Sequence, residues 1–130
     1  MIWKTSSGLM LTLGLMACSG APADWRVSLD EGRAILESRQ ALVFDIREPE
    51  EHATGVAAGA LLLPMSQLNQ RVGEIPLDPY QPVLLICNTQ NRSAKVVEAL
   101  REAGWSNVRH VHGGMSDWAK RGWPMIKPAG

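Results

Sequence analysis

Short and almost continuous apolar runs constrain the fold of this chain more than any other feature. The two clearest runs cover residues 41–46 and 82–87, and a third covers residues 60–63. Such runs, without polar alternation, are typical of strands that are buried on both faces, as in a parallel sheet. Residues 108–111 are expected to form a strand at or near an edge of the sheet, and residues 25–28 a short first strand.

Helical patterns lie between these runs. Residues 29–38, 67–75 and 93–103 have apolar side chains at helical intervals, and Gly104 is expected to end the last helix. Strands that alternate with helices over short links predict an α/β fold on a parallel sheet. In such sheets the chemistry lies beyond the carboxyl ends of the strands.

Residues 1–23 are expected to form a targeting segment with a short tether, and residues 24–130 the folded domain. A single positive charge at Lys4 precedes a short apolar stretch and small residues, which is the pattern of a secretory signal. The apolar stretch is shorter than the about 20 residues that a membrane-spanning helix needs. The roughly 110 residues that remain fit one domain.

The end of the targeting segment has the sequence Leu-Met-Ala-Cys at residues 15–18 and resembles a bacterial lipobox. In that pattern the cysteine is lipidated, so the prediction is an exported lipoprotein of the cell envelope that faces the periplasm and is anchored to the membrane through Cys18. Cleavage after the Ala-Pro-Ala sequence at residues 21–23 is the alternative, and it would release a soluble periplasmic protein. Both interpretations export the domain.

The charge of the chain argues against nucleic acid as a partner. The sequence has 13 basic and 13 acidic side chains, and removal of residues 1–17 takes away only Lys4 from these. A nearly neutral chain lacks the clustered basic footprint that nucleic acid needs.

Cys87 ends the apolar run at 82–87 and begins a polar loop, which leads into the expected helix at 93–103. The first turn of a helix presents unpaired backbone N–H groups and the positive end of the helix dipole. A curled loop adds further N–H groups and forms an anion cradle, in which a cysteine is driven towards the thiolate. Arg92 adds a permanent cation with forked donors that suit oxyanions. The sequence therefore predicts a nucleophilic sulfur facing an anion pocket.

Three chemistries fit a Cys-x4-Arg loop of this kind: sulfur transfer through a persulfide, phosphoryl or arsenate chemistry, and thiol redox chemistry. The absence of a Cys-x-x-Cys motif makes the redox interpretation weaker. Cys87 could also be an inert structural residue or form a disulfide with Cys18. We favour neither, because structural cysteines usually lie in apolar surroundings and secreted disulfide frameworks usually have more than two cysteines.

His110 and His112 alternate on the expected strand at 108–111, so they could share a face and bind a metal ion. We favour a plain strand-end pair, because no third ligand lies nearby in the sequence and a zinc site needs three or four protein ligands.

Three motifs resemble the rhodanese family. The loop from Cys87 to Ser93 is similar to its active loop, which has Cys, four residues, Arg and then Ser or Thr. Residues 45–51 are similar to its upstream Asp-x-Arg-Glu segment, and residues 113–118 to its C-terminal signature, in which Trp118 is expected to be a core residue. The related cell-cycle phosphatases have an active loop that is one residue longer.

The resemblance implies a rhodanese-like three-layer α/β fold, with a central, mostly parallel five-stranded sheet and helices on both faces. It implies a sulfurtransferase whose catalytic Cys87 takes a sulfane sulfur from thiosulfate, a persulfide or a polysulfide. The sulfur is held as a persulfide and passed to a thiol, cyanide or a protein acceptor, without a metal or organic cofactor. The alternative is a non-catalytic interaction module of the same fold in the cell envelope, although such members tend to have lost the cysteine.

The resemblance also assigns the surrounding residues. Asp45 and Arg47 are expected to support the active loop as structural residues, with a possible indirect part in the site. The loop that binds the substrate consists of Asn88, Thr89, Gln90, Asn91, Arg92 and Ser93.

The chain departs from the family pattern at a few positions. Val56 and Ala57 stand where the family usually has His-Ile, His52 stands where an aromatic residue is common, and Gln90 replaces a frequent glycine. A positive φ at Gln90 would carry a steric cost that glycine avoids. Efficient thiosulfate users in the family often have an additional cation in the loop, which here has only Arg92. We therefore expect thiosulfate to be a poorer donor than a less charged persulfide or polysulfide.

Overall fold

The structure, a computed structural model, describes residues 25–128. One sheet has the strand order β1-β5-β4-β2-β3, and all of its neighbouring strands are parallel. Its strands are β1 (Arg26–Val27), β2 (Leu42–Asp45), β3 (Leu61–Leu62), β4 (Val83–Ile86) and β5 (Val108–Val111). The predicted α/β fold is confirmed, and the sheet is entirely rather than mostly parallel. The predicted targeting segment, with Cys18, lies outside the described residues.

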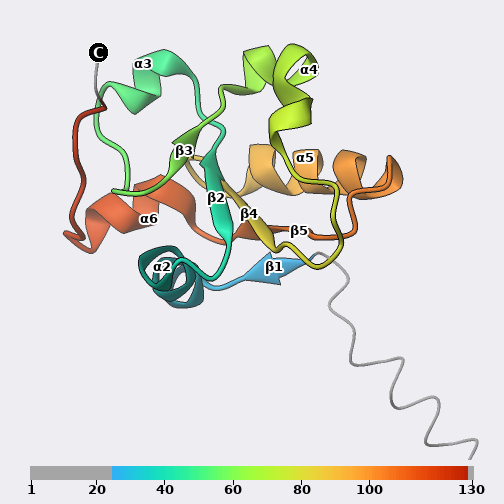
Figure 1. Ribbon diagram of the computed structural model, residues 1–130. Helices are drawn as coiled ribbons and strands as arrows, with labels where there is room; N and C mark the ends of the chain where they lie inside the picture. Colours follow the sequence, from blue (N-terminus) through green and yellow to red (C-terminus); the bar gives the residue numbers. More distant parts are fainter. Residues whose placement is uncertain (1–24, 129–130) are drawn as a thin grey trace, which may run out of the picture.

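Helices cover both faces of the sheet (Figure 1). Residues of α2 (Leu29–Ser38) and α6 (Gly114–Lys120) contribute to the core on one face, and residues of α5 (Asn91–Glu102) to the core on the other. The smaller elements are α3 (Pro49–His52), the 3-10 turn η1 (Met65–Gln67), α4 (Leu68–Arg71) and the 3-10 turn η2 (Val72–Glu74). The three-layer arrangement follows from these two cores.

Strand β4 shows how an apolar run without alternation supplies both layers. Val83 and Leu85, together with Cys87 after the strand, belong to the core that includes α5. Leu84 and Ile86 belong to the core that includes α2 and α6. Successive side chains of a strand point to opposite faces of the sheet, and this alternation places Cys87 on the α5 side.

The helices differ in part from the prediction. α2 has the predicted bounds, and its N-cap Ser28 accepts the Glu31 N–H at 3.0 Å. α5 begins at Asn91, ahead of the predicted start at residue 93. The predicted helix at 67–75 is wrong as a continuous element, because the structure has one short α-helix followed by a 3-10 turn there. Gly73 in that segment lowers the helix propensity.

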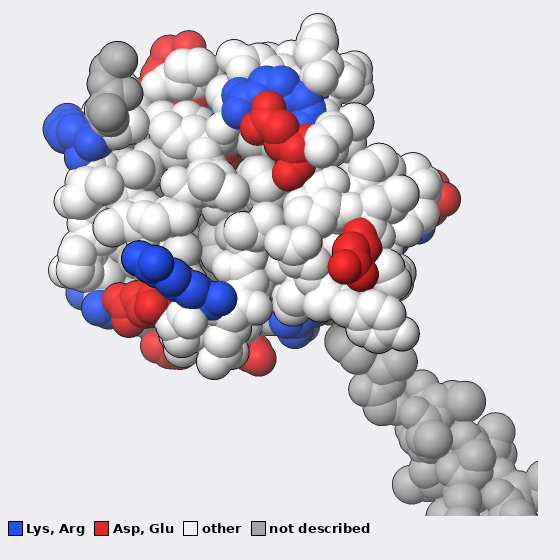
Figure 2. All heavy atoms as spheres, viewed as in Figure 1, with Lys and Arg blue, Asp and Glu red and all other residues white. Residues whose placement is uncertain are grey.

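Trp118 is a core residue, as predicted, and its indole N–H donates to the Pro124 carbonyl at 2.9 Å. At the surface, the face shown in Figure 2 has acidic and basic side chains in small separate groups among uncharged residues. Within residues 25–128, no helix is both long enough and apolar enough to cross a membrane.

Candidate active site

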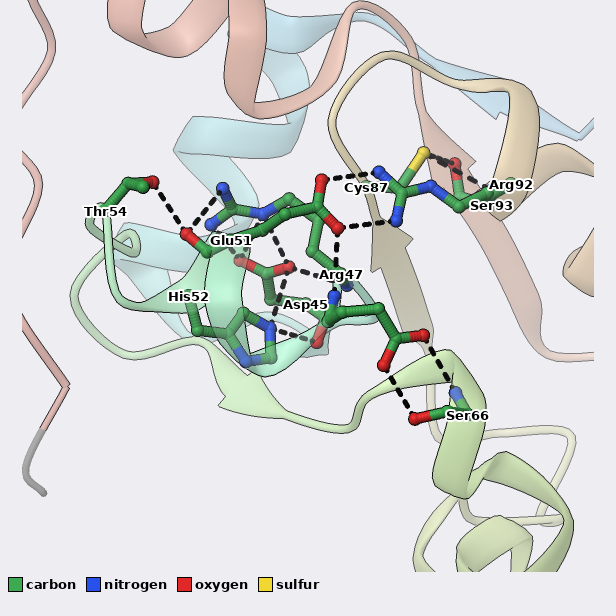
Figure 3. A network of polar contacts seen from close by, with 10 residues as sticks. Asp45, Arg47, Glu51, His52, Thr54, Ser66, Cys87, Arg92 and Ser93 are labelled. Carbon is green, nitrogen blue, oxygen red and sulfur yellow. Dashed lines mark hydrogen bonds and ion pairs between the residues drawn. The ribbon is translucent and has the colours of Figure 1, made fainter.

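Cys87 lies directly after β4, at the carboxyl end of the central strands, and is only 1% exposed. The start of α5 contacts its sulfur: the Ser93 backbone N–H donates to Sγ at 3.4 Å, and Ser93 Oγ lies 3.3 Å from Sγ. Figure 3 shows Ser93 beside the sulfur. A helix start favours negative charge nearby, so the start of α5 can stabilise an anion bound beside the sulfur.

The carbonyl groups at the start of the active loop are held by α6. The Met115 N–H donates to the Cys87 carbonyl and the Ser116 N–H to the Asn88 carbonyl, both at 2.8 Å. Gly114, the first residue of α6, faces the active loop, and a Cβ there would touch the carbonyl oxygen of Cys87. Its φ of +59° also favours glycine. The signature at 113–118 therefore fixes the conformation of the active loop by bonding its carbonyl groups.

This orientation of the carbonyl groups determines where the amide groups of the loop point. The C=O and N–H of a trans peptide point in opposite directions, so the N–H groups of Asn88 and Thr89 point away from α6. Neither N–H donates to another group among residues 25–128. The two groups are therefore available to an anion bound on that side of the loop.

Gln90 has a role in the loop that its sequence position did not reveal. Its φ is −153°, so the expected steric cost of replacing glycine does not arise. Its side-chain Oε1 accepts the Gly113 N–H at 3.2 Å. Outside glycine, positive φ values within residues 25–128 occur only at Trp25 and Arg39. The side chain of Gln90 therefore ties the loop to the start of the α6 segment.

Arg92 is engaged by Glu51, a residue that sequence reasoning did not single out. Its two terminal nitrogens donate to the two carboxylate oxygens of Glu51, both at 2.7 Å. The Arg92 hydrogen bond lowers the pKa of the Glu51 carboxyl to about 2, against an opposing effect of burial. The pKa of Arg92 is raised, first by Glu51 and in part by the charge of Cys87. The forked donors expected to bind the oxyanion of a donor are thus already paired.

Asp45 and Arg47 form a buried ion pair that supports α3, the helix that carries Glu51 (Figure 3). Arg47 donates to the Asp45 carboxylate at 2.7 Å and to the Gly55 carbonyl at 2.9 Å. His52 Nε2 lies 3.2 Å from an Asp45 carboxylate oxygen. A histidine at this position, where the family commonly has an aromatic residue, thus joins the same buried network. The two predicted supporting residues act on α3 rather than on the loop itself.

Glu48 joins this segment to the chain that follows β3. Its carboxylate accepts the Ser66 hydroxyl at 2.6 Å and the Ser66 N–H at 3.0 Å. Glu48 also caps α3, in a capping box with Glu51, whose side chain accepts the Glu48 N–H at 3.0 Å. These contacts fix the position of the Glu51 carboxylate.

The two histidines that could share a strand face lie in different environments. His110 is buried in β5, whereas His112 follows the strand and is exposed. Within residues 25–128, no group of three or more His, Cys, Asp and Glu side chains is arranged to hold a metal ion.

Comparison with known proteins identifies the family. The family described as "Rhodanese-like domain" matches residues 28–121. A protein of Allochromatium vinosum named "Sulfurtransferase" is 34% identical over 96 residues, which cover 74% of this chain and 88% of that protein. The human "Thiosulfate:glutathione sulfurtransferase" is 29% identical over 115 residues, with 79% of this chain and 97% of that protein covered. The crystal structure of a rhodanese-like domain protein from Staphylococcus aureus has a TM-score of 0.68 and 30% identity, covering 80% of this chain and 98% of that one. The sheet order, the cysteine loop between β4 and α5 and these similarities agree: the chain belongs to the rhodanese-like domain family.

Proposed function

We propose that the chain is a sulfurtransferase and that Cys87 holds the transferred sulfur as a persulfide. One observation carries the proposal: the sulfur accepts the Ser93 N–H at the start of α5, beside a loop whose Asn88 and Thr89 N–H groups have no partner within residues 25–128. Such N–H groups stabilise an anionic outer sulfur. The relatives named sulfurtransferases support the same activity.

The transfer takes place in two half-reactions. The Cys87 thiolate attacks the outer sulfur of the donor, and a new S–S bond forms as the S–S bond of the donor breaks. When thiosulfate is the donor, the leaving group is sulfite; when a persulfide is the donor, the leaving group is the corresponding thiolate. A thiol, cyanide or a protein acceptor then takes the outer sulfur, and the electron pair of the broken bond returns to Cys87. This is covalent catalysis with ping-pong kinetics.

The burial of Cys87 sets a condition on this scheme. Because the residue is 1% exposed, a donor reaches the sulfur only after a neighbouring side chain moves. Asn88 and Thr89 follow the cysteine directly and are exposed, so we propose that their side chains are the ones that move.

Intact-mass spectrometry tests the proposal. The full chain is incubated with thiosulfate or with a small alkyl persulfide, and we expect the mass to increase by one sulfur atom that cyanide removes. Cys87→Ser should gain no sulfur, whereas the matched variant Cys18→Ser should gain as much as the wild type. Equal sulfur uptake by Cys87→Ser would overturn the mechanism. No uptake by any form of the protein would favour a non-catalytic interaction module.

We also propose that the domain is exported and anchored to a bacterial envelope membrane through lipid on Cys18. The support is the sequence of residues 1–23, with its single charge, short apolar stretch and lipobox-like end. Cleavage after residue 23 remains the rival and would give a soluble periplasmic protein.

A further inference from the structure

The Glu51–Arg92 pair removes the net positive charge from the active loop. Arg92 is the only charged side chain between Cys87 and Ser93. Both of its terminal nitrogens are bonded to the Glu51 carboxylate at 2.7 Å. The charge of Cys87 also acts on Arg92. The sulfur therefore faces a pair with a net charge of zero rather than a free cation.

The pair stays ionised and in place under ordinary conditions. The hydrogen bond from Arg92 holds the pKa of Glu51 at about 2, so the carboxylate keeps its charge in any neutral buffer. Glu51 cannot swing away easily, because it also caps α3 through the Glu48 N–H. The Arg47 side chain ties α3 down further, since it donates to the Glu51 carbonyl at 3.4 Å and to the Gly55 carbonyl at 2.9 Å.

The other charges that act on this pair do not supply a free cation. Arg47 acts on Glu51, but Arg47 is itself paired with Asp45. Glu48 acts on Arg92 and adds a negative charge. A donor that approaches the thiolate therefore meets surroundings without excess positive charge, and it depends on the Asn88 and Thr89 N–H groups.

We propose that Glu51 is a positioning residue that selects the sulfur donor by its charge, favouring a persulfide of low charge over the thiosulfate dianion. The inference rests on the proposed sulfurtransferase function and specifies its donor. Thiosulfate has two negative charges, whereas a small hydroxyalkyl persulfide has at most one. Each donor is repelled by the Cys87 thiolate, and with Arg92 neutralised this repulsion is stronger for the dianion.

A series of charge variants tests the proposal. Glu51→Gln keeps the shape of the side chain and its ability to accept the Glu48 N–H, but it leaves Arg92 with a net charge of +1. Arg92→Gln leaves Glu51 with a net charge of −1. The double variant, with both substitutions, returns the pair to zero, as in the wild type. Circular dichroism checks the fold of each variant.

The measured quantity is the rate constant for sulfur uptake by Cys87 from thiosulfate, divided by that from 2-hydroxyethyl persulfide. We expect this ratio to change about tenfold for each unit of charge on the residue pair. The reason is that the pair lies a few ångströms from the bound donor, and thiosulfate has one more negative charge than the persulfide anion. The ratio should be highest in Glu51→Gln, lowest in Arg92→Gln, and close to the wild-type value in the double variant. Added salt should reduce the gain of Glu51→Gln, since mobile ions screen partly exposed charges.

The outcomes separate the two proposals. A ratio that stays constant across the series would overturn the role of Glu51 and leave the sulfurtransferase function intact. Equal losses with both donors in Glu51→Gln and in the double variant would also overturn it, because they would show a structural role only. Wild-type protein that takes up sulfur from neither donor would overturn the sulfurtransferase function together with the role of Glu51.

Discussion

Replacement of Gly114 by alanine tests how α6 shapes the active loop. The new Cβ would touch the carbonyl oxygens of Cys87 and Thr89 and lie 2.6 Å from that of Asn88. These are backbone atoms, and two of the three carbonyls accept hydrogen bonds from α6, so they cannot move without loss of those bonds. A left-handed backbone costs a non-glycine residue about 1–2 kcal/mol, and overpacking adds about 1–3 kcal/mol. We expect Gly114→Ala to lower the free energy of unfolding by about 2–5 kcal/mol.

Gly122→Ala is the matched control for this substitution. Gly122 has a φ of +69°, close to the +59° of Gly114, but a Cβ added at Gly122 would have no heavy atom of residues 25–128 within 4 Å, apart from its own residue and its two chain neighbours. It should therefore cost only the backbone term of about 1–2 kcal/mol. Urea denaturation gives both free energies, and the rate of sulfur uptake by Cys87 should fall by about 100-fold in Gly114→Ala alone, because misplaced reacting groups lose rates of this order. Equal destabilisation by the two substitutions, with unchanged uptake in Gly114→Ala, would refute the account of the loop.

Three further predictions concern the ion pairs and the anchor. Asp45→Asn should lower the free energy of unfolding by about 3–5 kcal/mol, because Arg47 would be left buried without its ion-pair partner. Asp30→Asn removes the exposed pair with Arg121 and is the control; in the same denaturation assay it should cost at most about 1 kcal/mol. The pKa of Glu51 is lowered from 4.5 to about 2, so the stability that its carboxylate contributes is complete above about pH 4.5 and is lost as the pH falls towards 2. In denaturation at several pH values, Glu51→Gln should lack this part of the decrease in stability, which is small because the pair is partly exposed to solvent. In cell fractionation, wild-type protein should be found with the membrane and Cys18→Ala in the soluble fraction, and a soluble wild type that begins at Asp24 would contradict the lipid anchor.

Most of the fold was predictable from local patterns. The runs at 41–46 and 82–87 became β2 and β4, and the pattern at 29–38 became α2 with the same bounds. These elements are predictable because a strand buried on both faces, or a helix buried along one stripe, has a recognisable hydrophobic pattern within a few consecutive residues. The position of Cys87 between a strand and a helix follows from the same hydrophobic patterns.

The short elements were not predictable in this way. α3 has four residues, and α6 begins with a glycine, so neither shows a long periodic pattern. Both nevertheless contact the active loop, α6 through the Met115 N–H and α3 through Glu51. The motifs at 45–51 and 113–118 marked these segments as relevant, but they did not show which atoms meet the loop.

The sequence by itself therefore determined the layered parallel sheet and the place of the cysteine, because both depend on side-chain patterns within single elements. The tertiary structure decided the electrostatics of the site. Glu51 lies 41 residues from Arg92 in the chain. The pair forms only because α3 and the start of α5 both lie at the carboxyl ends of the neighbouring parallel strands β2 and β4. The direction of the loop amides was likewise decided by the N–H groups of α6, since a peptide turns its N–H away from the donor that holds its carbonyl.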